Sequence, residues 1–157
     1  MKKELEKKLI EKFPRLFKGK GMPLTENLMS FGCEINDGWY DLMYETCTKL
    51  NDFPVILVQV KEKFAGLRIY IDPDDNLIKN MTKYEISEVF KKAYQIINDM
   101  EEKSFTICEV CGKEGKTYVR NYWYKTLCED HKKEFEYQEI KEFKEKKREN
   151  DKKETEN

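Results

Sequence analysis

Two pairs of potential metal ligands are the feature that most restricts how this chain can fold. Cys108 and Cys111 are separated by two residues, and Cys128 and His131 repeat that spacing after sixteen intervening residues. Zinc favours four ligands in a tetrahedron, and thiolate sulfur with imidazole nitrogen satisfies it, so paired ligands at this spacing are typical of structural zinc sites. The sequence therefore predicts one structural Zn2+ per chain, bound by these four side chains.

The segment between the two ligand pairs predicts the rest of a small zinc unit. Gly112 relieves backbone strain after a tight knuckle. Residues 116–119 and 122–127 suit two short strands around Arg120-Asn121, and residues 128–131 fall where a helix begins. This order of knuckle, hairpin and helix resembles the treble-clef class of zinc finger.

We do not expect an enzyme. Four good ligands leave zinc no open position for a catalytic water. His131 is the only histidine in the chain, so nucleophilic triads and nuclease sites that need a histidine base have no candidate. Carboxylates are plentiful, but no pair of them stands in a recognisable catalytic motif.

Length and composition indicate a cytoplasmic protein. The longest apolar run, residues 55–58, is far below the roughly 20 residues that cross a bilayer, and the charged N-terminal stretch lacks an apolar signal segment. Five cysteines, three of them at metal-ligand spacing, suit a reducing compartment. Cys33 and Cys47 have apolar neighbours and are expected to be buried core thiols.

The charge distribution excludes a uniformly basic coat for nucleic acid, since the net charge is −1. Residues 21–54 are acidic, and they predict either one acidic face or an ordinary solvated surface. The acids are Glu26, Glu34, Asp37, Asp41, Glu45 and Asp52, against the single cation Lys49.

Apolar periodicity predicts an α+β fold in which helices pack on a small antiparallel hairpin or sheet. A helix over residues 5–13 ends at Pro14, and residues 18–32 read as a surface connection. A helix over residues 38–50 is expected to be capped by Asn36 or Asp37. The strongest helix prediction is residues 82–102, because Thr82 and Glu85 form a capping box; turn residues 72–76 precede it.

Residues 55–72 alternate as a β-hairpin requires. If the apolar residues of both strands lie on one face of the hairpin, Val60 pairs with Ile69 and Val58 with Ile71. Residues 63–66 then form a four-residue loop. Lys61 then lies opposite Arg68, an unfavourable pairing unless an anion or a neighbouring acid compensates it.

Three regions follow from these elements. Residues 1–103 are expected to form the α+β core domain, and residues 104–145 the treble-clef-like zinc finger with a closing helix. Residues 146–157, almost wholly charged, are expected to be a disordered tail.

Two surfaces are candidate binding sites. The hairpin face opposite the apolar side offers cations, an amide and a ring suited to a nucleotide or another phosphorylated small molecule; acids from other segments are the alternative partners of its cations. The finger hairpin interleaves cations with rings that suit nucleic acid or a protein partner, or that simply form the finger's own core. The first set is Gln59, Lys61, Lys63, Arg68 and Tyr70, and the second is Tyr118, Arg120, Tyr122, Trp123 and Lys125.

Five short motifs together carry a resemblance: Phe31-Gly32-Cys33-Glu34, Asp37-Gly38-Trp39-Tyr40-Asp41-Leu42, Val60-Lys61-Glu62-Lys63-Phe64, Leu67-Arg68-Ile69-Tyr70 and Leu127-Cys128-Glu129-Asp130-His131. They resemble small proteins encoded by bacteriophages and prophages, over residues 28–131. The family pattern has glycine at Ala65 and a small polar residue at Gly66, so the hairpin turn departs from it. The resemblance implies a phage accessory protein that acts in the bacterial cytoplasm on host takeover or evasion of host defence.

The sequence thus favours a non-enzymatic phage protein that binds or sequesters a nucleotide signal or other phosphorylated ligand. The alternative is a module that binds protein or nucleic acid through the zinc finger.

Overall fold

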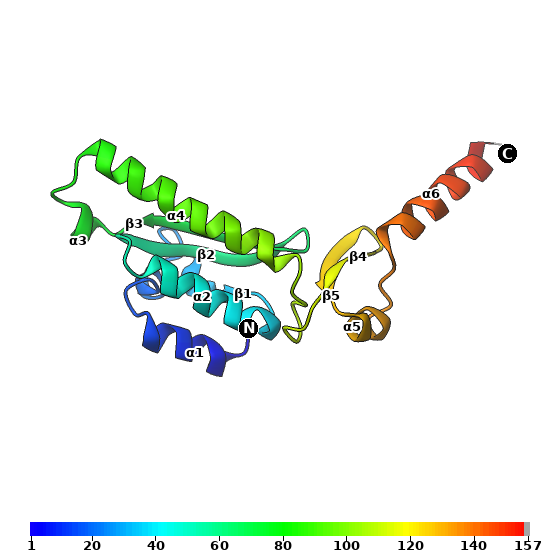
Figure 1. The fold of residues 1–157 in the computed structure, drawn as a ribbon, viewed down its shortest axis with the longest axis horizontal. Helices are drawn as coiled ribbons and strands as arrows, with labels where there is room; N and C mark the ends of the chain where they lie inside the picture. Colours follow the sequence, from blue (N-terminus) through cyan, green and yellow to red (C-terminus); the bar gives the residue numbers. More distant parts are fainter. Residues whose placement is uncertain (156–157) are drawn as a thin grey trace.

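A computed structural model describes the backbone of residues 1–155 and the side chains of residues 1–148. It confirms the α+β class: helices pack on a three-stranded sheet, and a separate two-stranded sheet lies nearer the C-terminus (Figure 1). The helices are α1 Lys3–Lys12, α2 Tyr40–Leu50, α3 Asp75–Ile78, α4 Lys83–Ser104, α5 Glu129–Glu134 and α6 Ile140–Thr155, and the strands are β1 Cys33–Glu34, β2 Val55–Lys63, β3 Gly66–Pro73, β4 Lys116–Arg120 and β5 Trp123–Leu127.

The larger sheet is mixed rather than purely antiparallel, which corrects the expected hairpin. Its order is β1-β2-β3, and the two-residue strand β1 pairs in parallel with β2, with Cys33 opposite Val60. So short a strand has no alternating pattern by which the sequence could predict it.

The β2–β3 register agrees with the prediction near the turn and departs from it further away. Val60 faces Ile69 and Lys61 faces Arg68 as expected, but Ile71 faces Leu57 instead of Val58. A bulge between Leu57 and Gln59 causes the shift, because the extra residue lets Leu57 and Val60 both point into the core.

The β2–β3 turn is also tighter than expected. Lys63 pairs with Gly66, so the loop has two residues, Phe64 and Ala65, with φ of 54° and 67°. Left-handed backbone at both central positions suits a two-residue hairpin, although glycine or asparagine usually occupies these positions.

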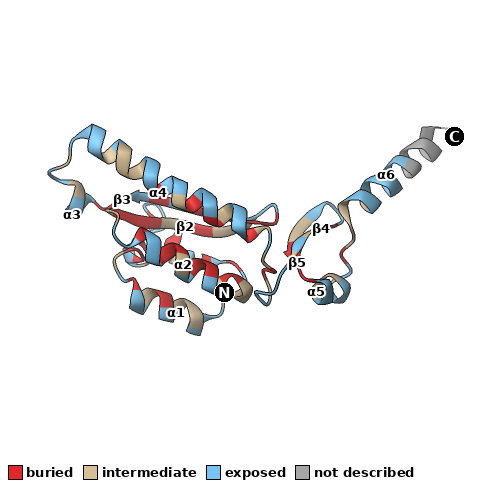
Figure 2. Cartoon of the chain, in the orientation of Figure 1, coloured by how far each residue is buried: buried red, intermediate tan, exposed pale blue. Residues whose placement is uncertain are grey.

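Most of the buried apolar side chains form one cluster shared by α1, α2, the sheet and the C-terminal half of α4 (Figure 2). Cys33 and Cys47 belong to this cluster as expected, and burial raises the pKa of the Cys33 thiol to about 12. Along α4, Ala93, Ile97 and Met100 are buried, whereas Ile86 and Val89 nearer its start are only half-buried. The core therefore buries the second half of the predicted apolar stripe most deeply, while Val89 and Phe90 pack against it at the edge.

Helix α4 also covers the free edge of β3. Ser104 Oγ accepts a hydrogen bond of 2.9 Å from the backbone N–H of Leu67, and Glu101 Oε1 accepts one of 3.0 Å from that of Ile69. These bonds satisfy edge donors that would otherwise be open to pairing with another chain. The capping box of Thr82 and Glu85 at the start of α4 is present as predicted.

One helix cap and one connection differ from the sequence prediction. Neither Asn36 nor Asp37 caps a helix with its side chain; Asn36 bonds to Glu109, and Asp37 forms an ion pair of 2.9 Å with Lys2. The segment 18–32 is not wholly a surface connection, since it contains two 3-10 turns and buries Met29. The acidic residues of 21–54 are partly neutralised, as Glu45 pairs with both Lys49 and Lys103.

The C-terminal region is built around a second, smaller cluster of Cys108, Tyr118, Leu127, Cys128 and Tyr137. Helix α6 leads away from it and continues through Thr155, so residues 146–155, expected as a disordered tail, are helical here (Figure 1). Residues 156–157 lie outside the described part of the chain.

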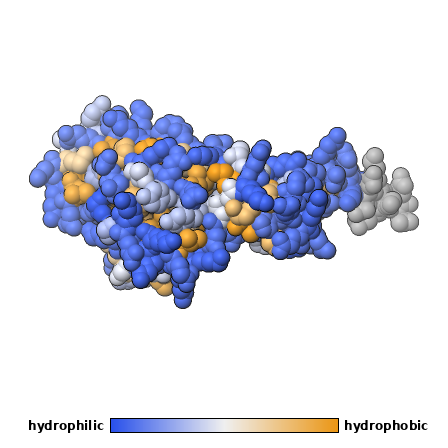
Figure 3. All heavy atoms as spheres, turned by 60° about the horizontal axis from the view of Figure 1, so that its bottom comes forward, coloured by the Kyte–Doolittle hydropathy of each residue, from blue (hydrophilic) through white to orange (hydrophobic). Residues whose placement is uncertain are grey.

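Among the described residues, no helix is long and apolar enough to cross a membrane. The face of the molecule shown in Figure 3 is largely hydrophilic and carries separate apolar patches.

Candidate metal centre and aromatic groove

Cys108, Cys111, Cys128 and His131 lie together, as their spacing predicts. Their ligand atoms are all within 4.8 Å of one another. His131 Nδ1 lies 3.5 Å from Cys108 Sγ and 3.2 Å from Cys128 Sγ, and the Sγ atoms of Cys111 and Cys128 are 3.8 Å apart. This cluster could hold one metal ion.

Local structure brings the two ligand pairs together. Gly112, with φ of 78°, reverses the chain after Cys111, and its N–H donates to the Cys108 carbonyl over 2.9 Å. Cys128 stands immediately before α5, so His131 follows it on the first turn. The expected hairpin is present, but its two-residue turn is Asn121-Tyr122, one position later than predicted.

The thiols of the cluster differ in acidity. Burial alone raises the pKa of Cys128, but hydrogen bonds from the His131 backbone and ring and from the other thiols outweigh it and bring that pKa to about 7. Burial and hydrogen bonds to Cys108 and Cys128 raise the pKa of Cys111 to about 11. Metal ligation requires thiolates, so binding of an ion would release protons from this site.

The turn of residues 108–112, here called the metal knuckle because it carries two of the candidate ligands, packs against the residues at the start of α2. The Gly38 N–H donates to the Glu109 carbonyl over 2.9 Å, and Trp39 Nε1 donates to the Ile107 carbonyl over 2.8 Å. A Cβ at Gly38 would lie 2.2 Å from the carbonyl oxygen of Cys108. Gly38 and Trp39 therefore form the surface against which residues 107–112 pack.

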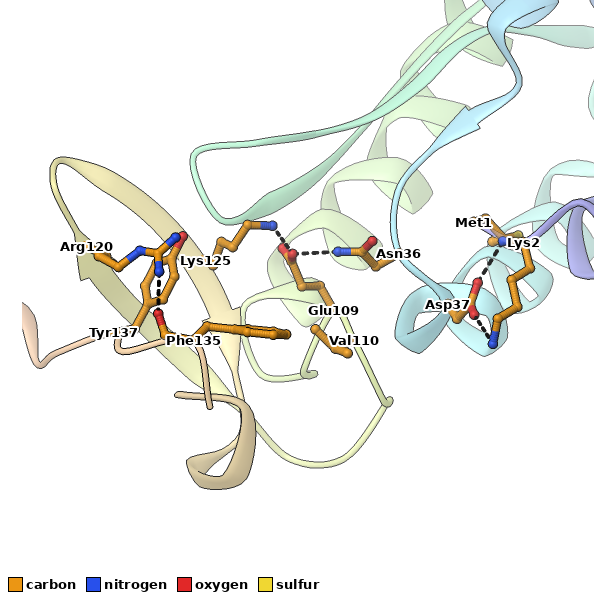
Figure 4. Close-up of a pocket in the computed structure, with 10 residues that line it drawn as sticks. All are labelled: Met1, Lys2, Asn36, Asp37, Glu109, Val110, Arg120, Lys125, Phe135 and Tyr137. Atoms are coloured by element: carbon orange, nitrogen blue, oxygen red, sulfur yellow. Dashed lines mark hydrogen bonds and ion pairs between the residues drawn. The ribbon is translucent and has the colours of Figure 1, made fainter. Parts of the chain in front are cut away.

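A pocket of about 620 Å3 lies along this seam (Figure 4). Most of its charged groups have partners: Glu109 Oε1 lies between Lys125 and Asn36, Lys2 pairs with Asp37, and Arg120 donates to the Phe135 carbonyl over 2.8 Å. Glu109 Oε2 is buried and has no hydrogen-bond partner among the described residues. Burial raises the pKa of Glu109, although Lys125 opposes that effect. We interpret the pocket as a joint between the core and the finger.

The residues expected to bind a phosphorylated ligand lie on one face of the β2–β3 hairpin. Arg68 there has a local partner, because its Nη1 lies 3.5 Å from Glu101 Oε2 and its guanidinium stands over the ring of Phe105. Lys61 Nζ stands 5.4 Å from the ring centroid of Tyr70. Tyr70 on β3 lies opposite Gln59 on β2. Burial raises the pKa of Glu101 despite the opposing effects of Ile69 N–H and Arg68.

The residues expected to bind a partner on the second hairpin differ in how accessible they are. Tyr118 is buried, and its hydroxyl donates to Glu129. Arg120 stacks over Tyr137, and Lys125 pairs with Glu109. Tyr122 and Trp123 remain on the surface.

The tips of the two hairpins meet and form a groove of about 490 Å3. Thr126 Oγ1, near the end of β5, donates over 2.8 Å to the carbonyl of Ala65, which holds the β2–β3 turn against strand β5. Three rings of the groove are largely exposed: Phe64 at 71%, Tyr122 at 63% and Trp123 at 75%. The lining residues are Glu62, Lys63, Phe64, Tyr122, Trp123 and Tyr124.

This groove does not follow from the sequence. The residue pattern places Lys63 in one candidate surface, Tyr122 and Trp123 in another, and Phe64 in neither. Only a long-range contact unites them, and the one available signal was a bulky aromatic residue in each hairpin turn.

Comparison of the chain with protein-family models, curated proteins and solved structures gave no match.

Proposed function

We propose that this chain is a binding protein without a catalytic role, and that the groove between its hairpin tips is the recognition surface. The observation that carries the proposal is the exposed cluster of Phe64, Tyr122 and Trp123 around one groove. Aromatic side chains on a surface are costly to leave in water and are enriched where partners bind. The sole histidine lies in the metal cluster, which argues against histidine-dependent catalysis.

We further propose that the cluster holds one structural zinc ion in a treble-clef-type finger. Tetrahedral zinc, with Zn–S of about 2.3 Å and Zn–N of about 2.0 Å, separates two sulfur ligands by about 3.8 Å and sulfur from nitrogen by about 3.5 Å. The ligand distances of 3.8, 3.5 and 3.2 Å agree with this geometry. Three thiolates and an imidazole favour zinc over oxygen-loving ions.

The biological setting proposed is that of a phage accessory protein acting against host defence in the bacterial cytoplasm. This part rests on the sequence resemblance alone.

A second candidate function is capture of a nucleotide signal or other phosphorylated ligand on the face with Gln59, Lys61, Lys63, Arg68 and Tyr70. One observation favours it. Among the side chains that the structure describes, Lys61 and Lys63 take part in no ion pair and instead stand over rings. Arg68 is a weaker anchor, since Glu101 already accompanies it.

The two cations of this face are expected to contribute differently to stability. Arg68→Gln should lower the free energy of unfolding by about 1 kcal/mol, because it leaves the half-buried Glu101 without its partner. Lys61→Gln should leave stability unchanged or raise it slightly, since it relieves a like-charge pair. Urea denaturation of both variants measures this. Equal destabilisation by the two changes would contradict the assignment.

The proposed function is tested by comparing baits. Immobilised wild-type protein and the double variant Phe64→Ala with Trp123→Ala are incubated with extract of phage-infected bacteria, and the retained nucleic acids, proteins and small molecules are identified by sequencing and mass spectrometry. We expect a component that the wild type retains and the double variant loses. Tyr84→Ala is the matched control, because Tyr84 is 74% exposed on α4 away from the groove.

Identical retention by the wild type and the groove variant would refute the groove as the recognition surface. A nucleotide retained by both, but lost in Lys61→Gln with Lys63→Gln, would instead support the second candidate.

A further inference from the structure

The backbone at the groove holds aromatic residues where they are conformationally unfavourable. Phe64 and Tyr122 both occupy two-residue hairpin turns with positive φ, at 54° and 66°. Bulky side chains rarely adopt this conformation, and asparagine or glycine usually takes such positions. Strain of this kind persists at functional sites, so these rings are presented to solvent at a cost in stability.

Lysines stand over these same rings. Lys63 Nζ lies 5.2 Å from the ring centroid of Phe64, and Lys147 Nζ lies 5.3 Å from that of Tyr122. Lys61, two positions before Lys63 on β2, extends the row of cations along the sheet face. The one acid lining the groove, Glu62, has an oxygen engaged by the Ala65 N–H over 2.8 Å.

This combination discriminates between classes of partner. Protein interfaces are depleted in lysine, whereas surfaces that bind unpaired nucleic acid combine cations for the phosphates with rings on which bases stack. A duplex hides the faces of its bases, so exposed rings favour a single strand.

We propose that the groove binds single-stranded nucleic acid, with bases stacked on Trp123, Tyr122 and Phe64 and phosphates beside Lys63, Lys61 and Lys147. The inference rests on the proposed function and adds the class of partner. The net charge of −1 does not oppose it, because Lys63 lines the groove and Lys61 and Lys147 stand over rings beside it.

Fluorescence anisotropy of a labelled mixed-sequence oligonucleotide tests the inference, with single-stranded DNA, the same sequence as RNA, and the DNA duplex as separate probes. We expect both single strands to bind more tightly than the duplex. The ratio of the affinities for single-stranded DNA and RNA identifies the preferred sugar. Phe64→Ala and Trp123→Ala should each weaken binding by at least about 5-fold through lost stacking. Tyr84→Ala should bind as the wild type does.

Salt dependence tests the cations separately. Three lysine–phosphate contacts predict a slope of about −2 in log K against log salt, which is about a 20-fold loss between about 50 and 200 mM. Lys63→Gln should reduce the magnitude of the slope by about 0.7.

Tryptophan fluorescence reports on the groove directly. The chain has two tryptophans, and Trp39 is buried whereas Trp123 is 75% exposed. Binding should therefore quench Trp123, and Trp123→Phe should abolish that change while preserving most of the affinity. Melting temperature and metal content of each variant confirm that it is folded.

Absence of binding to either single strand, equal affinity for the duplex, or unchanged affinity in the groove variants would overturn the inference. The proposed function would survive the first result if the bait comparison still gives a groove-dependent protein or small molecule.

Discussion

Purified Cys128→Ser and Cys111→Ser proteins are expected to lose the metal and to unfold the C-terminal region. The wild type should carry about one zinc per chain, whereas three remaining ligands bind it far more weakly. Cys128 is the more severe change, because it is buried and lies near both Cys111 and His131. Structural zinc contributes roughly 10–16 kcal/mol of binding free energy in zinc-finger peptides, and that energy is coupled to folding.

Metal analysis by mass spectrometry and thermal melting measure this effect. Cys33→Ser is the matched control, since it replaces a buried thiol of the main core and should leave the zinc content unchanged. The small cluster around Tyr118 and Leu127 should melt early in both metal-site variants. Clearly substoichiometric zinc in the wild type, with unchanged melting of both metal-site variants, would contradict the assignment of a structural metal.

Gly38→Ala is expected to be the most destabilising of the Gly→Ala substitutions in this chain. The added Cβ would lie 2.2 Å from Cys108 O, 2.5 Å from Gly112 N and 2.6 Å from Cys111 N. All three are backbone atoms of the metal knuckle, so no flexible side chain can move aside, and the knuckle itself must shift. Overpacking of this kind costs about 1–3 kcal/mol, which corresponds to a melting temperature lower by roughly 2–10 °C.

Gly21→Ala is the matched control, because a Cβ there meets no atom within 4 Å. Differential scanning calorimetry of both variants, with metal content measured in parallel, decides the matter. If Gly38→Ala melts at the same temperature as Gly21→Ala, the close backbone contact between Gly38 and residues 108–112 does not exist in solution.

The metal cluster was predictable because its information is local. Two residues between ligands, a glycine after the second and a helix start at the third determine most of its geometry within a few positions. The α4 capping box and the pairing of Val60 with Ile69 were predictable for the same reason, since a capping box spans four residues and strand alternation has a period of two. Helix boundaries at Pro14 and after Leu50 likewise followed from neighbouring residues.

Several of the errors and omissions concern contacts between distant segments. The bulge at Val58 places both Leu57 and Val60 in the core, and the two-residue strand β1 is a strand only through its pairing with β2. Asn36 resembles a helix cap by its position, but its side chain bonds to Glu109. The sequence left open whether an acid from another segment accompanies Arg68, and α4 supplies Glu101.

By itself, then, the sequence determined the class of fold, the ligand set of the metal cluster and the register near the hairpin turn, because each depends on spacing along one segment. Only the tertiary structure decided why Gly38 and Trp39 accompany the metal motif, and how Phe64 and Trp123 come to line one groove. Both arrangements depend on close contacts between segments that are far apart in the sequence. No short stretch of the sequence contains the information that predicts such contacts.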